Sequence, residues 1–566
     1  CKKAIEIDPN SAQAYNNLGA NLIFLENFDE ALKYFEKSIE INPNQVDANI
    51  NIGNFLKNRG QAEKSFKYFL KAIDINPKIA KNYNDYGMAL KKIGRFDEAL
   101  NQLNKALKIN PNFFNAYVNI GNILKNRREY SGAIENFKKA NKINPNLEIS
   151  YSNILFTSNY FEDFKIKDYL NYAKELRSTY KRINDSKISS YAFEKKPEKL
   201  NIGFVSGNFN DHSVGHFLLD IIKELKEKDI NTFAYNNNNF NNDQQTKKFK
   251  EYFYKWNTIF DKDNLEVINL IRNDKIHILI DLAGHTEFSK LEIFLNKPAP
   301  IQATWLGYNG STGIPEIDYC IGDKIAFPSD TEKRFVEKIW HLPEVMQCLS
   351  KPSFDLEIQP LPAIKNKFLM FGSFNNPAKI TNDVILTWSK ILNSIKNSKI
   401  LLKSNYYSDS FIVNGILEKF IENKVQKNRI IFQKGSKARK EILETYNQID
   451  ISLDTFPYNG VTTSHESIWM GVPVLTKSGL TPHSRIGKSL NQNIKMEDWT
   501  AENKEDYVKK AIKFSKDISK LSIIRKKVRK ELLQTSSFNS KIFTSHLEET
   551  FWKMWEFFLK KTHNKN

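Results

Sequence analysis

A twenty-residue stretch in the C-terminal half, DTFPYNGVTTSHESIWMGVP at 454–473, carries side chains suited to binding a phosphorylated ligand. The pattern predicts a strand end, a glycine turn and a helix that begins near Thr462 and Thr463. Free backbone N–H groups and the positive end of the helix dipole make such a helix start an anion site. Glu466 follows one turn later, within reach of a ribose hydroxyl. The same residues also suit a plain connector, with the threonines capping the helix and Glu466 solvated.

Further candidates for chemistry lie in other loops. Lys379 follows one predicted strand and precedes a predicted helix, where a lysine can neutralise a diphosphate as a point charge. His212, His216 and His285 also follow predicted strands, and an imidazole can act as a general base near neutral pH. A structural histidine, satisfied inside the protein, is the alternative for each of them.

From Leu200 onward, short apolar runs alternate along the chain with helical patterns, and these elements must position the candidate residues. This alternation predicts parallel sheets covered by helices, in two Rossmann-like lobes. The lobes are expected at 198–345 and 367–536, joined by an irregular, Pro-rich linker at 346–366 and followed by a C-terminal helix and tail at 537–566. Five unusual loops, which include all the candidates above, fall at the carboxyl ends of predicted strands. Open αβ sheets bind ligands at that edge, so we expect one ligand site between the lobes.

A different period governs residues 1–147. Pro9, Pro43, Pro77, Pro111 and Pro145 recur every 34 residues, and small residues keep the same spacing. This is the tetratricopeptide signature, which predicts a superhelical solenoid of helix pairs with an extended concave surface. A helical linker is expected at 148–197. One register position holds amides and an acid that either bind a peptide backbone or recur by chance in an Asn-rich chain: Asn17, Asn51, Asp85 and Asn119.

The composition of the chain bears on its partners, its compartment and its need for a metal or a membrane. The net charge of +19 comes mostly from dispersed Lys, without a nucleic-acid-binding motif, so no nucleic-acid partner is expected. Three cysteines without metal-ligand spacing suit a reducing compartment, and we expect a cytoplasmic protein. No apolar run is long enough for a membrane span, and no sequence pattern calls for a metal or a cofactor. Because the chain begins with Cys inside a repeat, its natural N-terminus is expected to lie upstream.

Tetratricopeptide repeats followed by the motifs HSVGHF, DLAGHT, PAPIQATWLGY, FGSFNNPAKI and DISLDTFPYNGVTTSHESIWMGVPV resemble one family, the O-linked N-acetylglucosamine transferase and SPINDLY family of GT-B glycosyltransferases. The resemblance covers the repeats and nearly all of 198–540. It implies an inverting, metal-independent transfer of a sugar from a nucleotide diphosphate to Ser or Thr of proteins, with acceptors held along the repeats. The repeats are also a candidate surface for oligomer assembly.

The resemblance also implies roles for individual residues. Lys379, Thr462 and Thr463 match the diphosphate-binding elements, and Glu466 matches the ribose-binding acid. His212 matches a histidine proposed to act as base or to position the sugar. The remaining matches line the pocket near the sugar or precede the lysine: His285, Gly307, Asn375 and Asn376.

The chain departs from the animal branch of this family at several positions. Val461, Ala378 and Asn309 stand where that branch has His, Tyr and Pro. Ala438 and Glu441 stand near its base-contacting Lys and His. UDP-N-acetylglucosamine is therefore the first expectation for the donor, with GDP-fucose and UDP-glucose as rivals. A scaffold with inactive transferase lobes, and a transferase acting on small molecules or glycans, are the other hypotheses.

Overall fold

The computed structural model describes residues 1–25, 27–161, 164–180, 194, 196–238, 243–436 and 438–563. The chain divides into two compact units, one formed mainly by residues 1–150 and the other by most of residues 151–563. Each is described by itself below. No helix among the described residues is both long and apolar enough to cross a membrane.

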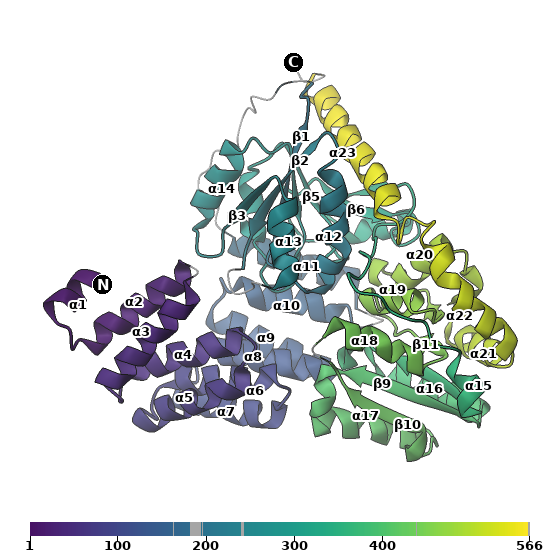
Figure 1. Cartoon of the computed structure of the whole chain (residues 1–566), viewed down its shortest axis with the longest axis horizontal. Helices are drawn as coiled ribbons and strands as arrows, with labels where there is room; N and C mark the ends of the chain where they lie inside the picture. The colour runs from purple at the N-terminus through teal and green to yellow at the C-terminus, as the bar shows by residue number, and fades with distance from the viewer. Residues whose placement is uncertain are drawn as a thin grey trace. The chain divides into compact units, whose positions relative to one another are not determined.

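The first unit is a solenoid of paired helices (Figure 1). The two helices of each pair approach closely because small residues face one another. The buried positions Ala31, Ser65, Ala99 and Ala133 are fully inaccessible to solvent. A Cβ built on Gly121 would lie 2.5 Å from the Phe137 ring, so glycine is required for this approach. The helices are α1 (Lys2–Ile7), α2 (Ala12–Phe24), α3 (Phe28–Ile41), α4 (Val46–Asn58), α5 (Ala62–Ile75), α6 (Ala80–Lys92), α7 (Phe96–Ile109), α8 (Phe114–Asn126) and α9 (Tyr130–Ile143).

Two further helices, α10 (Glu148–Ser158) and α11 (Ile166–Thr179), precede the first sheet. The segments at 162–163, 181–193 and 195 of the expected 148–197 linker lie outside the described residues. From α11, Tyr169 donates a hydrogen bond to the Ser311 carbonyl oxygen at 2.7 Å. The helical segment therefore packs against the first lobe.

The first lobe is a parallel sheet of seven strands among the described residues, in the order β3-β2-β1-β4-β5-β6-β7. The strands are β1 (Leu200–Ser206), β2 (Ile230–Asn236), β3 (Lys255–Thr258), β4 (Ile278–Asp281), β5 (Ile301–Thr304), β6 (Tyr319–Asp323) and β7 (Lys338–Leu342). The intervening helices are α12 (Ser213–Leu225), α13 (Gln244–Tyr252) and α14 (Asn264–Asn273). Asp263 and Glu266 close a capping box on α14.

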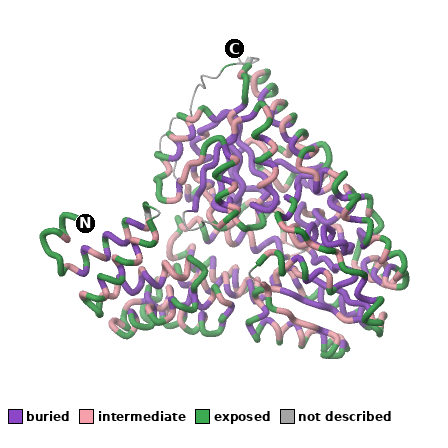
Figure 2. Tube along the Cα trace, in the orientation of Figure 1, coloured by how far each residue is buried: buried purple, intermediate pink, exposed green. Residues whose placement is uncertain are grey.

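The second lobe is a six-stranded parallel sheet in the order β10-β9-β8-β11-β12-β13, counted over the described residues. Its strands are β8 (Leu369–Ser373), β9 (Ser398–Ser404), β10 (Ile430–Lys434), β11 (Ile451–Leu453), β12 (Val474–Lys477) and β13 (Thr500–Ala501). Its helices are α15 (Pro362–Asn366), α16 (Asn382–Ser394), α17 (Ser410–Glu422), α18 (Arg439–Thr445), α19 (Thr462–Trp469), α20 (Ile486–Asn493), α21 (Lys504–Ser515) and α22 (Ile518–Leu532). Figure 2 shows that both sheets are the most deeply buried parts of this unit. The predicted fold class, a tetratricopeptide solenoid followed by two α/β lobes, is confirmed.

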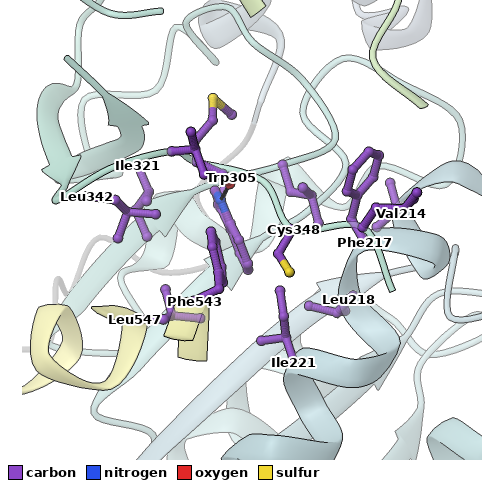
Figure 3. Close-up of a cluster of buried hydrophobic side chains, with 14 of the residues drawn as sticks. Val214, Phe217, Leu218, Ile221, Trp305, Ile321, Leu342, Cys348, Phe543 and Leu547 are labelled. Carbon is purple, nitrogen blue, oxygen red and sulfur yellow. Dashed lines mark hydrogen bonds between the residues drawn. The ribbon is translucent and has the colours of Figure 1, made fainter. Parts of the chain in front are cut away.

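The last helix, α23 (Ser540–His563), follows the second lobe in sequence but packs on the first, against α12, β5 and β7. Figure 3 shows Phe543 of α23 beside Trp305, which follows β5. The two rings stack with centroids 6.2 Å apart. Trp305 is almost wholly buried, and its indole N–H donates a hydrogen bond to the Met346 carbonyl oxygen at 2.9 Å. Helix α23 and the segment at Met346 thus both complete the core of the first lobe.

Candidate functional site

The loops after β8 and β11 form the centre of the site because these two strands are neighbours in the second sheet. Asn375 follows β8 and Thr463 belongs to α19 after β11, and the Thr463 hydroxyl donates a hydrogen bond to Asn375 Oδ1 at 2.9 Å. The Lys379 ammonium donates a hydrogen bond to the Asn459 carbonyl oxygen at 2.8 Å. Asn376 caps the short η3 turn (Pro377–Lys379) by accepting from the Ala378 N–H, which fixes the backbone that carries Lys379. The structure therefore brings together the lysine, the amide pair and the threonines.

The charge of Lys379 is influenced by desolvation and by two neighbours, the Tyr458 ring and the Asp454 carboxyl group. Its Nζ lies 4.1 Å from the centroid of the Tyr458 ring, a cation–π contact. Desolvation lowers the pKa of Lys379 to about 8, while the charge of Asp454 opposes the decrease. Asp454 accepts hydrogen bonds from the Gly460 N–H and the Thr476 hydroxyl, and burial raises the pKa of Asp454 to about 6. Between these values Lys379 is a charged and partly desolvated cation, which can stabilise a diphosphate strongly.

The start of α19 has no side-chain cap. Val461 is the N-cap residue and makes no capping hydrogen bond from its side chain. The Thr463 hydroxyl donates to Asn375 rather than capping this helix, as the alternative of a plain connector would have it. The first backbone hydrogen bond of the helix runs from the His465 N–H to the Val461 carbonyl oxygen. The N–H groups of Thr462 and Thr463 have no intrahelical acceptor and remain suited to an anion.

Glu466 is buried, with 5% of its surface exposed, and therefore is not a solvated side chain. Its Oε1 lies 3.3 Å from Nε of Arg439, the first residue of α18. We did not single out Arg439 from the sequence, although it lies between Ala438 and Glu441, the two positions at which the chain departs from the animal branch. The sequence does show a cation at position 439, but the spacing of residues does not reveal in which direction its side chain points.

The first lobe contributes α12 to the same cleft. His465 of α19 contacts Phe217 of α12 edge to face, with ring centroids 4.9 Å apart. At the start of α12, His212 is the N-cap residue and its Nδ1 accepts a hydrogen bond from the Val214 N–H at 3.2 Å. Although His212 is exposed, surrounding protein desolvates its ring and, with the neighbouring His216, lowers the pKa of His212 to about 4. A neutral ring that accepts at Nδ1 carries its proton on Nε2, which is then a hydrogen-bond donor.

The two other histidines named from the sequence lie in structural contacts. His216 Nε2 lies 2.7 Å from Asp211 Oδ1 in the first lobe. His285 is buried, its Nδ1 lies 3.2 Å from the Ser152 hydroxyl, and burial lowers the pKa of His285 to about 4. One nitrogen of each ring has a protein partner, whereas His216 Nδ1 and His285 Nε2 are buried without a hydrogen-bond partner among the described residues, so neither ring is fully satisfied inside the protein.

The backbone at Gly307 lies very close to the backbone at Leu282. A Cβ at position 307 would lie 1.9 Å from the Leu282 carbonyl oxygen. The next residue, Tyr308, contacts the His285 ring edge to face at 5.1 Å. Phe156 of α10 contacts both Tyr308 and Tyr458, with centroids 6.2 and 6.3 Å apart. This aromatic cluster joins the loop that contains Gly307 to the Tyr458 ring on which Lys379 lies.

In the solenoid, the in-register amides connect neighbouring repeats. Asn51 Nδ2 donates a hydrogen bond to Asn16 Oδ1 at 2.9 Å. Asn119 Nδ2 donates to Asn84 Oδ1 at 2.8 Å. At the two other register positions, Asn17 accepts from Gln13, and Asp85 pairs with Lys81 at 2.8 Å. All four register positions thus make polar contacts within the solenoid, and a role for them in peptide binding stays a prediction.

No group of three or more His, Cys, Asp or Glu residues that could hold a metal ion is found among the described residues.

The family model described as glycosyl transferase family 41 matches residues 179–348 and 361–547, together more than half of the chain. Models of the tetratricopeptide repeat match residues 12–45, 34–67, 68–101 and 114–147. A point mutant of the O-GlcNAc transferase from Thermobaculum terrenum has a similar structure, with a TM-score of 0.85. The match covers 91% of this chain and 98% of that chain at 24% identity, which shows a shared fold.

Curated relatives agree with the family match. A probable UDP-N-acetylglucosamine–peptide N-acetylglucosaminyltransferase SPINDLY from Petunia hybrida is 33% identical over 65% of this chain and 40% of its own length. The relative of the same name from Eustoma exaltatum subsp. russellianum is 34% identical over 66% of this chain and 41% of its own length. The alignments thus span about 40% of these relatives. From the extent of the family match, the chain belongs to glycosyl transferase family 41.

Proposed function

We propose that this chain transfers N-acetylglucosamine from UDP-N-acetylglucosamine to Ser or Thr hydroxyls of proteins, with inversion at the anomeric carbon and without a metal. The observation that carries the proposal is the convergence of Lys379, the free start of α19 and the buried Glu466 at neighbouring strand ends. These groups match a diphosphate and a ribose in order along one ligand. The names of the plant relatives support the choice of sugar.

The proposed chemistry follows from where charge develops. The acceptor hydroxyl attacks the anomeric carbon from the face opposite the diphosphate, and the bond from that carbon to the diphosphate oxygen breaks. Lys379 and the N–H groups of Thr462 and Thr463 stabilise the negative charge on the leaving diphosphate. Because His212 Nε2 carries a proton, this nitrogen donates to the sugar or phosphate. A phosphate oxygen of the donor then takes the proton of the attacking hydroxyl.

The repeats present the acceptor in this proposal. The register positions Asn17, Asn51, Asp85 and Asn119 supply polar groups at a constant spacing, which suits an extended peptide backbone. We expect Asn119→Ala to weaken transfer to protein acceptors by several-fold and to leave donor hydrolysis unchanged, because the change removes a proposed peptide contact and none of the groups proposed to bind the donor. Equal losses of transfer and hydrolysis would contradict this role for the repeats.

A donor screen read by intact-protein mass tests the proposed function. The purified chain is incubated with an acceptor protein mixture and UDP-N-acetylglucosamine, GDP-fucose or UDP-glucose in separate reactions, with a Lys379→Met variant as the blank. We expect an added N-acetylhexosamine with the first donor. A mass increase with GDP-fucose alone, or with UDP-glucose alone, would show that this nucleotide sugar is the donor instead. The absence of both transfer and hydrolysis with all three donors would favour the scaffold hypothesis.

A further inference from the structure

The first helices of the repeats form one row along the solenoid. Helix α2 contacts α4, α4 contacts α6 and α6 contacts α8, whereas the second helices α3, α5, α7 and α9 contact one another less. Because a solenoid curves toward the row whose members lie closer together, the first helices line its concave side. The hydrogen bonds from Asn51 to Asn16 and from Asn119 to Asn84 run along this row. The concave row is therefore a continuous surface on which an extended segment can lie.

The charges on the concave row are mostly positive. Its four helices carry five lysines and two aspartates, namely Lys57, Lys81, Lys91, Lys92 and Lys125, with Asp47 and Asp85. Asp85 already pairs with Lys81 at 2.8 Å. The second helices instead carry ten lysines and nine acids, so the abundance of Lys in this chain does not by itself produce a surface of one sign. The positive bias belongs to the concave row.

Three of these lysines occupy the same position in successive repeats. Lys57, Lys91 and Lys125 are 34 residues apart, and each is half-buried on its helix. Lys57 Nζ donates a hydrogen bond to Asn54 Oδ1 at 2.7 Å, and Lys125 Nζ donates to Asn122 Oδ1 at 3.1 Å. These two asparagines come three residues after the register amides and so lie beside them on the helix surface. The lysines therefore border the row of amides.

Lys57 shows that the charges of neighbouring repeats meet on this surface. Desolvation lowers the pKa of Lys57 to about 8, and the charge of Asp85 opposes this decrease. Three lysines of the next helix in the row add to the decrease by repulsion, namely Lys92, Lys81 and Lys91. Below that pH, Lys57 is a cation held beside other cations. A carboxylate supplied by a bound chain would offset the repulsion among them.

We propose that the concave row selects acceptor proteins with an acidic segment, whose carboxylates pair with Lys57, Lys91 and Lys125 while its backbone lies on the register amides. The proposal rests on the proposed function, in which the repeats present the acceptor. A polypeptide suits this surface because an asparagine side chain carries both a donor and an acceptor, as does a peptide backbone. The lysines recur at a regular interval, so an extended chain with several acids meets more than one of them.

Fluorescence anisotropy with two labelled peptides tests this selection on the full chain. The peptides have the same length and one central Ser, and one carries Glu at every third position where the other carries Gln. We expect the Glu peptide to bind about ten- to hundredfold more tightly at low ionic strength, the combined effect of three ion pairs near the surface. This preference should shrink as salt is added, because salt screens the charges.

Three triple variants assign the preference to the concave row. Changing Lys57, Lys91 and Lys125 to Gln should remove the preference, and changing them to Arg should keep it, because Arg retains the charge. The matched control is Lys71→Gln with Lys105→Gln and Lys139→Gln. It removes three exposed lysines with the same 34-residue spacing from the second helices of the same repeats, so the loss of net charge is equal. The control should keep the preference, and the thermal midpoint establishes that each variant is folded.

Several results would overturn the proposal. Equal affinities of the wild-type chain for the Glu and Gln peptides would do so, and so would equal losses in the two Gln triple variants. A single-stranded RNA that binds more tightly than the Glu peptide, and through the same three lysines, would overturn the assignment to an acidic polypeptide.

Binding is measured without a donor, so that the selection and the proposed function fail separately. With UDP-N-acetylglucosamine added, we expect the central Ser of the Glu peptide to be modified faster than that of the Gln peptide. Preferential binding of the Glu peptide, without transfer from any donor, would support selection by charge and contradict the proposed function.

Discussion

We expect Lys379→Met to lower kcat by about a thousandfold while the chain stays folded. In the proposed reaction the bond from the sugar to the diphosphate breaks and negative charge develops on the leaving oxygens, and the Lys379 ammonium, which is bonded to the Asn459 carbonyl oxygen shortly before α19, stabilises that charge. At a separation of about 4 Å and an effective dielectric constant of about 20, one unit charge stabilises another by about 4 kcal/mol. Since about 1.36 kcal/mol corresponds to a factor of ten in rate, the loss is about three powers of ten.

The fold should tolerate this substitution. Methionine has a similar length and can keep the contact with the Tyr458 ring. Asp454, the buried acid that favours the charged lysine, keeps its hydrogen bonds from Thr455, Gly460 and Thr476 and so is not left without partners. A loss of about 1–2 kcal/mol would shift the thermal midpoint by only a few degrees in a unit of this size.

The assay compares single-donor turnover and donor hydrolysis for wild type, Lys379→Met and Lys390→Met. Lys390 is an exposed lysine on α16 and should behave as wild type. Circular dichroism and the thermal midpoint establish that each variant is folded. Turnover by folded Lys379→Met within about tenfold of wild type would refute the reasoning, because charge stabilisation at this position would then be dispensable.

Two further predictions concern the same site. The pKa of Lys379 is lowered to about 8, so the ammonium is present below that pH, and kcat/KM should fall as the pH rises through this value. A His212→Gln variant should show the same fall of kcat/KM at alkaline pH. A kcat/KM that stays constant up to about pH 10 would contradict the assignment of the charge to Lys379. Gly307→Ala places a Cβ 1.9 Å from the Leu282 carbonyl oxygen, so the loop must move, and we expect a lower thermal midpoint and loss of transfer. Gly415→Ala on α17 meets no atom within 4 Å and is the matched control, and equal behaviour of the two alanine variants would argue against a built-in close approach at Gly307.

Much of the fold could be predicted because apolar periodicity reports burial directly. The short apolar runs from Leu200 onward contain the strands β1, β2, β4, β5 and β8 to β12, and the 34-residue period predicted the solenoid. Four strands were missed, namely β3, β6, β7 and β13. The residues of β3, Lys-Trp-Asn-Thr, are partly exposed at a sheet edge, and β13 is two residues long, so neither presents an apolar run. Such strands are defined by their neighbours rather than by their own composition.

The site could be predicted as a set of loops but not as a set of contacts. Lys379 and Thr463 lay at strand ends whose proximity follows from the order of parallel strands, which is a general property of open αβ sheets. The partner of Glu466 could not be predicted, because Arg439 comes from a different strand end and its direction depends on how α18 packs. His285 shows the opposite case: its strand-end position fits a catalytic role, yet its ring nitrogen lies beside Ser152 in a buried contact.

The return of α23 to the first lobe also has a consequence for synthesis on the ribosome. The strands of the first sheet end at Leu342, yet Phe543 and Trp555 from the last helix fill its core and contact Trp305 and His277. The nascent first lobe therefore exposes an unfilled apolar surface while about two hundred further residues are translated. Domains fold as they emerge, and exposed apolar surface recruits chaperones or aggregates. A premature stop shortly before α23 would leave an intact second lobe attached to an incomplete first lobe, a product that a cell is expected to degrade rather than accumulate.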